Sequence, residues 1–144
     1  MMTNKFNWGF TLIELISVMI LVGIISVVLL SRMSVVGVSA VQSSRDDVIA
    51  ALFFAQQQAM MRSTITVVIT TNSISVNENN VPIQVSTDYY PLGMPSGVSA
   101  SPITLIYDKL GRTTATNITL TGSGNSSGAS ARIRVEASGY AFAN

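Results

Sequence analysis

The chain contains no cysteine and no histidine. Without cysteine it can form no disulfide, so its globular part must be held together by its own packing. Without histidine it lacks the commonest general base and the commonest ligand of transition metals. Both absences argue against a catalytic or metal-binding centre.

Charged side chains are also scarce, at 10% of residues with a net charge of +1. Lys5 lies among the first nine residues, and the side chains after them sum to zero. The chain therefore has no polybasic surface, which argues against strong nonspecific binding of nucleic acid.

The remaining carboxylates do not form a recognisable site. Asp46 and Asp47 are adjacent, and neighbouring residues on a helix point about 100° apart, so the pair cannot converge on a metal. Asp108 is a single carboxylate in a turn, whereas calcium takes about six to eight oxygens. No motif of a serine nucleophile is present. We predict no enzyme, and assign no catalytic residue, no cofactor and no metal site.

The chain does have one long hydrophobic run, from Phe10 to Leu30, in which Glu14 is the only ionisable residue. A helix needs about 20 apolar residues to cross the hydrocarbon core of a membrane. The run is too long for the core of a secretory signal, and no A-x-A cleavage site follows it. It predicts a membrane-spanning helix in which Glu14 requires a partner. A signal anchor that tolerates the glutamate is the simpler alternative.

The residues around Glu14 carry a motif. The string GFTLIEL, from Gly9 to Leu15, resembles the N-terminus of type IV pilins and type II secretion pseudopilins. The resemblance implies a leader, residues 1–9, that a prepilin peptidase cuts after Gly9. It also implies that Phe10 becomes an N-methylated N-terminus, and that Glu14 pairs with the N-terminal amine of a neighbouring pilin or pseudopilin subunit.

The same resemblance implies a location. The precursor would cross the bacterial inner membrane once, with its N-terminus in the cytoplasm and its head in the periplasm. An inner-membrane assembly platform would then move it into a pilus or pseudopilus. Many major pilins carry a disulfide in their C-terminal region, and this chain departs from that subgroup because it has no cysteine.

A second helical segment follows the hydrophobic run, over residues 31–62. Its apolar residues recur at three-, four- and seven-residue steps, which predicts an amphipathic helix that continues the first. The stripe consists of Val41, Val48, Leu52, Ala55 and Ala59, widened by Ile49, Phe53 and Met60. We expect this half of the helix to pack on the globular head.

After Arg62 the pattern changes to period two with β-branched residues, which predicts strands. They are expected at 64–71, 74–77, 81–86, 103–107, 116–121, 132–136 and 140–142. Pro82 indicates an edge strand. Residues 89–102 are expected to form a long loop and residues 122–130 a flexible polar one. The sequence thus predicts an α+β protein divided into 1–9, 10–30, 31–62 and a β-rich periplasmic head, 63–144.

The order of these head segments resembles the GspH/FimT-like branch of the superfamily. The fold it implies is one long helix packed on an antiparallel head, as a small sheet or a two-sheet sandwich. The implied function is that of a minor pilin, of the kind found in mannose-sensitive haemagglutinin (MSHA) pili as minor pilin C, which takes part in filament initiation. A type II secretion minor pseudopilin H is one alternative.

A FimT-like pilin that binds DNA is the other alternative. Arg132 and Arg134 are two residues apart and would share one face of a strand. The tail after Glu136 contains no lysine or arginine, and two arginines make a small electrostatic footprint. A solvated strand face is the favoured interpretation, so the sequence argues against a nucleic-acid partner.

Overall fold

The structure is a computed structural model that describes residues 10–62, 64–84 and 90–144, without the side chains of residues 28–36 and 125. The predicted leader, and Gly9 with it, lies outside the described residues. The chain divides into two compact units, Met1–Met33 and Ser34–Asn144, which are described separately below. The predicted α+β fold class is confirmed, with one long helix and two antiparallel sheets.

The helix α1, Leu12–Met61, contributes to both units. Thr11 caps its start, because the backbone N–H of Glu14 donates to the Thr11 hydroxyl oxygen at 3.3 Å. A threonine followed three residues later by glutamate is the sequence of a capping box, which fixes where a helix begins. Within the described residues, no helix combines the length and the apolar character that crossing a membrane requires.

The strands of the second unit form two sheets. The first has the order β3-β2-β1-β6, with β4 also paired to β2, and every pairing is antiparallel. Its strands are β1 Ile65–Ile69, β2 Ser73–Glu78, β3 Val81–Pro82, β4 Leu92–Gly93 and β6 Ile103–Tyr107. The prediction that the strand with Pro82 lies at a sheet edge is confirmed, because β3 ends the order.

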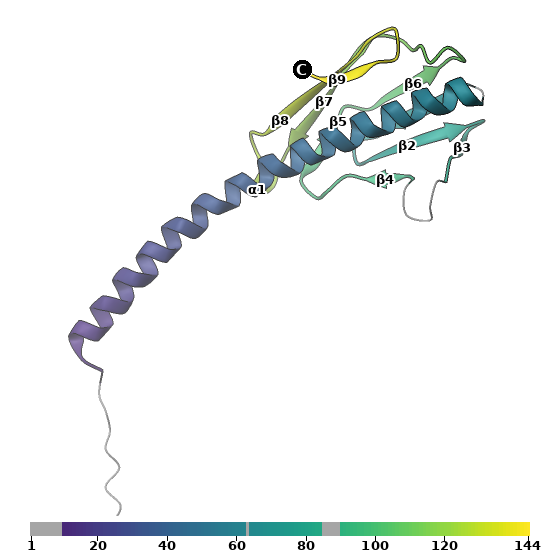
Figure 1. Cartoon of the computed structure of the whole chain (residues 1–144). Helices are drawn as coiled ribbons and strands as arrows, with labels where there is room; N and C mark the ends of the chain where they lie inside the picture. The colour runs from purple at the N-terminus through teal and green to yellow at the C-terminus, as the bar shows by residue number, and fades with distance from the viewer. Residues whose placement is uncertain (1–9, 63, 85–89) are drawn as a thin grey trace, which may run out of the picture. The chain divides into compact units, whose positions relative to one another are not determined.

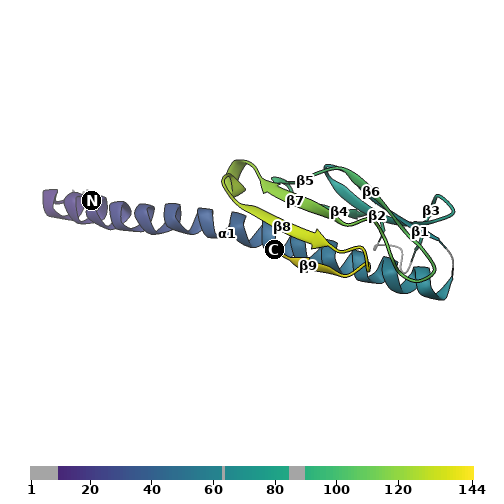
Figure 2. The ribbon, with the colours of Figure 1, turned by 90° about the horizontal axis from the view of Figure 1, so that it is seen from above.

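The second sheet has the order β5-β7-β8-β9 and is also antiparallel. Its strands are β5 Val98–Ala100, β7 Thr116–Gly122, β8 Ser130–Val135 and β9 Ala141–Ala143. The strands β5 and β6 follow each other directly, so the chain passes from one sheet to the other at Ser101–Pro102. Figure 1 shows the second half of α1 lying across both sheets, and Figure 2 shows the strands on one side of it.

The core lies between this half of α1 and the two sheets. The buried helical residues fit the predicted stripe, and Ala51 joins them; they are Val41, Val48, Ala51, Leu52, Ala55 and Ala59. Three of the six are alanines, which let the helix backbone approach the sheets closely. Each sheet adds its alternate residues, such as Val67 in β1 and Ile118 in β7. Truncating fully buried Leu52 to alanine would cost about 2–5 kcal/mol.

The prediction that Phe53 and Met60 belong to the buried stripe of α1 was wrong. Phe53 is 41% exposed and Met60 is 55% exposed. Phe53 lies beside the closing strand, with its ring centroid 5.8 Å from that of Tyr140. Its apolar surface is therefore partly covered by an aromatic side chain that comes 87 residues later in the sequence, and helical periodicity contains no information about that contact.

The two predicted loops were also wrong in part. Residues 89–102 contain β4 and β5, strands of two and three residues that neighbouring strands hold in place. Residues 122–130 include a single 3-10 turn, η1 Gly124–Ser126, and Ser126 is only 6% exposed. The N–H of Gly122 donates to the carbonyl of Ala129 at 2.8 Å, which closes this segment into a compact turn.

Candidate functional site

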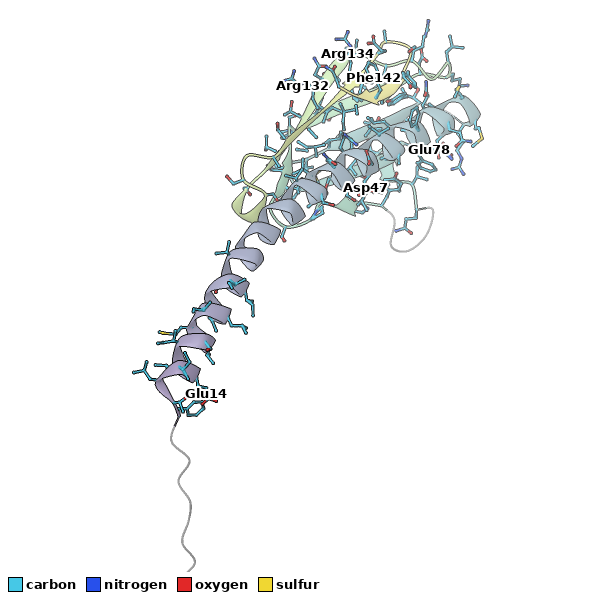
Figure 3. The ribbon with its side chains drawn as sticks, turned by 60° about the vertical axis from the view of Figure 1, so that its left-hand side comes forward. Glu14, Asp47, Glu78, Arg132, Arg134 and Phe142 are labelled. Carbon is cyan, nitrogen blue, oxygen red and sulfur yellow. The ribbon has the colours of Figure 1, made fainter. Side chains whose placement is uncertain are left out.

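The predicted assembly segment lies at the start of α1. Every described apolar side chain from Phe10 to Val27 is exposed, from 42% for Ile16 to 82% for Phe10. Glu14 is exposed in the first turn (Figure 3). A helix that is apolar on all sides is unstable in water and requires lipid or other helices around it. The carboxylate of Glu14 lies within this apolar surface, so any such environment must also provide it with a partner.

The two arginines considered for DNA binding lie on β8 and point away from the core, as their spacing predicts. Arg134 donates from Nε to the Glu136 carboxylate at 2.7 Å. Arg132 has no ion-pair partner among the described residues. The Glu136 carboxylate therefore offsets one of the two positive charges, which makes the electrostatic footprint smaller than the sequence alone suggests.

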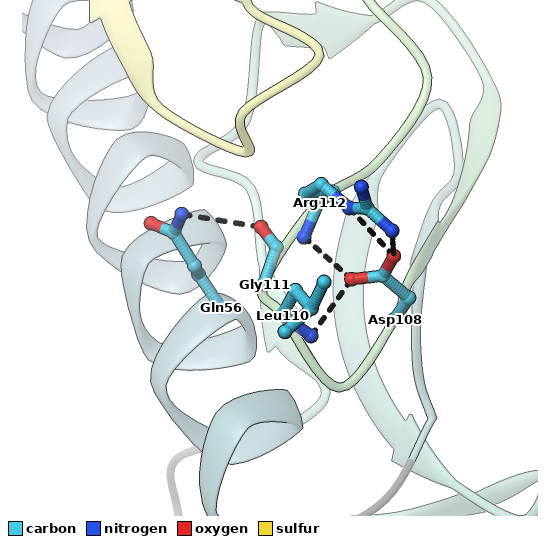
Figure 4. Close-up of polar contacts among 5 residues, drawn as sticks. All are labelled: Gln56, Asp108, Leu110, Gly111 and Arg112. Atoms are coloured by element: carbon cyan, nitrogen blue, oxygen red, sulfur yellow. Dashed lines mark hydrogen bonds and ion pairs between the residues drawn. The ribbon is translucent and has the colours of Figure 1, made fainter.

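The turn between β6 and β7 is ordered by Asp108. One of its carboxylate oxygens accepts the backbone N–H groups of Leu110 and Arg112, each at 2.9 Å, and the other accepts Arg112 Nε at 2.9 Å (Figure 4). The backbone hydrogen bond from Arg112 is the main reason that the pKa of Asp108 is lowered from 3.8. Both oxygens of Asp108 are engaged within the turn, so its role here is structural.

The same turn is tied to the helix through Gln56. Its side-chain Nε2 donates to the carbonyl oxygen of Gly111 at 3.2 Å and to that of Ser138 at 2.9 Å. Gly111 and Gly139 have φ angles of +71° and +86°, which an L-residue rarely adopts. A Cβ on Gly139 would collide with the Gly111 carbonyl oxygen. We call this arrangement of α1 and the two turns the Gln56 clamp.

Among the described residues, no three acidic, histidine or cysteine side chains lie close enough together to hold a metal ion. Asp46 accepts two hydrogen bonds from Arg45, at 2.7 and 2.9 Å. The side chain of Asp47 makes no hydrogen bond within the described part of the chain. Tyr107 is fully buried, and burial raises the pKa of its hydroxyl to about 12.

Two structural features were not predicted from the sequence: the cap at the start of α1 and the Gln56 clamp. The cap of α1 by Thr11 could have been found from the spacing of Thr11 and Glu14. The Gln56 clamp could not, because its partners are 55 and 82 residues away along the chain.

Comparison with known proteins shows what this architecture resembles. No family model matches the chain, and no curated protein sequence matches it. Among solved structures, the type IV minor pilin FimU of Pseudomonas aeruginosa is 16% identical with a TM-score of 0.54, and the match covers 72% of this chain and 87% of FimU. A second crystal form of FimU gives a TM-score of 0.53 at 15% identity, over 72% and 91% of the two chains.

The minor pseudopilin EpsH from the type 2 secretion system of Vibrio cholerae is 13% identical with a TM-score of 0.56. That match covers 72% of this chain and 95% of EpsH. At these identities the likeness concerns the fold. One long helix against two antiparallel sheets is the fold that this chain shares with a minor pilin and a minor pseudopilin.

Proposed function

We propose that this chain is a minor-pilin-type structural subunit of a type IV filament, and that its role is assembly rather than catalysis. The observation that carries the proposal is the position of the motif. Phe10 and Glu14 stand at the capped start of α1, on a chain whose head has the fold of minor pilins and minor pseudopilins. A prepilin peptidase would cut after Gly9, and Phe10 would be N-methylated.

The apolar run provides the second part of the proposal. We propose that residues 10–30 span the inner membrane, because the run is 21 residues long in the sequence and a span needs about 20 apolar residues. The side chains of residues 28–30 are not described, and no helix within the described residues meets the requirement for a span. The N-terminus would face the cytoplasm and the head the periplasm. An assembly platform in that membrane would then transfer the helix from lipid into the filament, where neighbouring helices replace the acyl chains around it.

Glu14 would determine how the subunits are staggered. A lone charge at the centre of a membrane helix costs about 2.5–3.5 kcal/mol on insertion scales. Processing creates an ammonium group at Phe10, and a neighbouring subunit can place that group against the carboxylate of Glu14. The pair removes the cost of an isolated charge and is formed at only one axial offset between the two helices, which fixes the register.

The intact mass of the protein, extracted from membranes with and without an active prepilin peptidase, tests this proposal. We expect a mature form that lacks residues 1–9 and carries one added methyl group on Phe10. A Gly9→Ala variant, which removes the residue before the cut, should stay at the precursor mass. An uncut chain in the presence of active peptidase would contradict the proposal.

The kind of filament is a separate question, because the fold resembles both a pilus subunit and a pseudopilus subunit. We propose a pilus of the MSHA type, on the resemblance of the head segments. Deleting the gene and scoring surface pili and protein secretion in parallel tests this. Loss of pili with normal secretion is expected, and loss of secretion with normal piliation would assign the chain to a pseudopilus instead.

A further inference from the structure

The last two residues of α1 are methionines, and they lie in different surroundings. Met60 is 55% exposed and Met61 is 63% exposed, so solvent reaches both side chains. Met60 follows Gln56 by four residues, which places these two side chains next to each other on one face of the helix. Met61 points about 100° away from Met60. The two methionines therefore differ in what they contact more than in how far they are exposed.

Met60 packs against the turn between β6 and β7. A Cβ on Gly111 would lie 3.2 Å from Cγ of Met60, 3.3 Å from its Sδ and 3.0 Å from Cγ of Gln56. These distances leave no room for an added atom between the thioether and the turn. Gly111 is buried, and its carbonyl oxygen accepts Nε2 of Gln56 at 3.2 Å (Figure 4). Met60 thus covers the Gln56 clamp at the point where Gly111 meets the helix.

The thioether is the group in this chain that mild oxidants attack most readily, because the chain has no cysteine. A peroxide transfers one oxygen atom to the sulfur. An S–O bond forms, the O–O bond breaks, and the peroxide is reduced to water or to an alcohol. The product is methionine sulfoxide, in which a polar group with an acceptor oxygen replaces an apolar one.

We propose that Met60 is a site of reversible oxidation by peroxides, and that its sulfoxide opens the Gln56 clamp. The new oxygen has no room on the side of Gly111, so the polar group turns toward solvent and draws the side chain away from the turn. The sulfoxide oxygen also competes for the N–H groups of Gln56 that Gly111 and Ser138 otherwise accept. Met61 is not among the nearest neighbours of Gly111 or of Gly139, so its oxidation should leave the clamp closed.

Opening of the clamp would loosen one particular part of the head. Ser138 lies in the turn that joins β8 to β9, so the bond from Gln56 holds the closing strand of the second sheet near α1. Regions held by few contacts open locally, without unfolding of the core. The inference concerns a modification of the head, and it does not depend on the filament role.

Titration of the full chain in detergent with hydrogen peroxide tests this inference. Peptide mass spectrometry measures the addition of one oxygen at Met60 and at Met61, and circular dichroism measures Tm. We expect both residues to be oxidised and Tm to fall by about 4 °C. Methionine sulfoxide reductases specific for the two sulfoxide epimers should together restore the mass and the Tm.

Two leucine variants identify the residue responsible. Met60→Leu keeps an apolar side chain of similar size over Gly111 and cannot be oxidised, so peroxide should leave its Tm unchanged. Met61→Leu is the matched control, and peroxide should lower its Tm as much as that of the unchanged protein. The remaining methionines are the same in all three proteins, so any effect of their oxidation cancels in the comparison.

Hydrogen exchange measures the opening of the clamp directly. The N–H of Gly139 donates to the carbonyl of Glu136 at 2.9 Å, within the turn that Gln56 holds. It should exchange about fivefold faster after oxidation. The N–H of Gly122, which donates to Ala129 at 2.8 Å in a different turn, should exchange at an unchanged rate.

Three results would overturn the inference. The first is a protein oxidised at Met60 whose Tm and Gly139 exchange rate are unchanged. The second is an equal fall in the Tm of Met60→Leu, because another methionine would then be responsible. The third is a Met60 that stays unoxidised under conditions that oxidise Met61, because peroxide would then not reach its sulfur.

Discussion

Replacing Gln56 with alanine should destabilise the head although it removes no apolar core residue. The variant loses the two hydrogen bonds from Nε2 to Gly111 and Ser138. A net hydrogen bond contributes about 1 kcal/mol, and a buried carbonyl left without a donor costs about 1–3 kcal/mol. Gly111 is buried whereas Ser138 is exposed and can bind water instead. We therefore expect a total loss of about 2 kcal/mol.

The next residue provides a matched control. Gln57 is the same residue type on the same helix, and its exposed side chain makes no hydrogen bond among the described residues. Both changes to alanine raise helix propensity equally, so that effect cancels in the comparison. Circular dichroism melts of the full chain in detergent should show Tm lowered by about 8 °C for Gln56→Ala, at about 4 °C per kcal/mol for a unit of this size. Equal Tm values for the two variants would refute the role of the Gln56 clamp.

Four further predictions follow from the same structure. Gly139→Ala should lower stability by about 2 kcal/mol or more, because the φ angle of Gly139 is +86° and the new Cβ would collide with the backbone oxygen of Gly111. Circular dichroism melts measure this, and an unchanged Tm would contradict it. The pKa of Asp108 is lowered in the folded chain, so its carboxylate contributes to stability above pH 3.8, and this contribution is lost as the pH falls through the folded pKa. The difference in Tm between the unchanged protein and Asp108→Asn should therefore shrink between about pH 5 and about pH 2. A constant difference would count against the hydrogen bonds described. Burial raises the pKa of Tyr107 to about 12, so ionisation of its hydroxyl favours the unfolded chain as the pH rises above 10. Tyr107→Phe should therefore unfold at a higher pH than the unchanged protein when unfolding is followed by circular dichroism. Unfolding of both proteins at the same alkaline pH would refute this. If Arg132 and Arg134 each contacted one DNA phosphate, the affinity of the protein for DNA would fall about 12-fold between about 0.05 and about 0.2 M salt. We therefore expect no DNA retardation at the higher salt. Retardation that persists there and disappears when both arginines are replaced would establish a DNA-binding role.

The periodicity of apolar residues was sufficient to predict the elements that bury one face. The helical stripe from Val41 to Ala59 and the strands β1, β2, β6, β7 and β8 could be predicted, because their periodicity reflects a single buried face. The strands β4 and β5 could not. They are two and three residues long, and they are strands only because β2 and β7 supply hydrogen-bonding partners.

The candidate site divides in the same way. The motif around Glu14 is contiguous and can be recognised in the sequence. The Arg134–Glu136 pair is local too, although it requires knowing that the chain stays nearly extended after β8 ends. The contact between Met60 and Gly111 was not predictable, because it joins the end of α1 to a turn that comes much later in the chain.

The Gln56 clamp also has a consequence for the order in which the chain is made. Gln56 is synthesised long before its two acceptors, and Ser138 is among the last seven residues. While the chain is being synthesised, the helix can be complete and the first sheet can be paired, yet the amide of Gln56 still lacks one acceptor. Tyr140, which covers Phe53, arrives in the same final segment. A chain cut short by even this small segment would expose more of the Phe53 ring and leave the Gln56 amide without its Ser138 acceptor, so we expect it to be less stable and more readily cleaved by proteases.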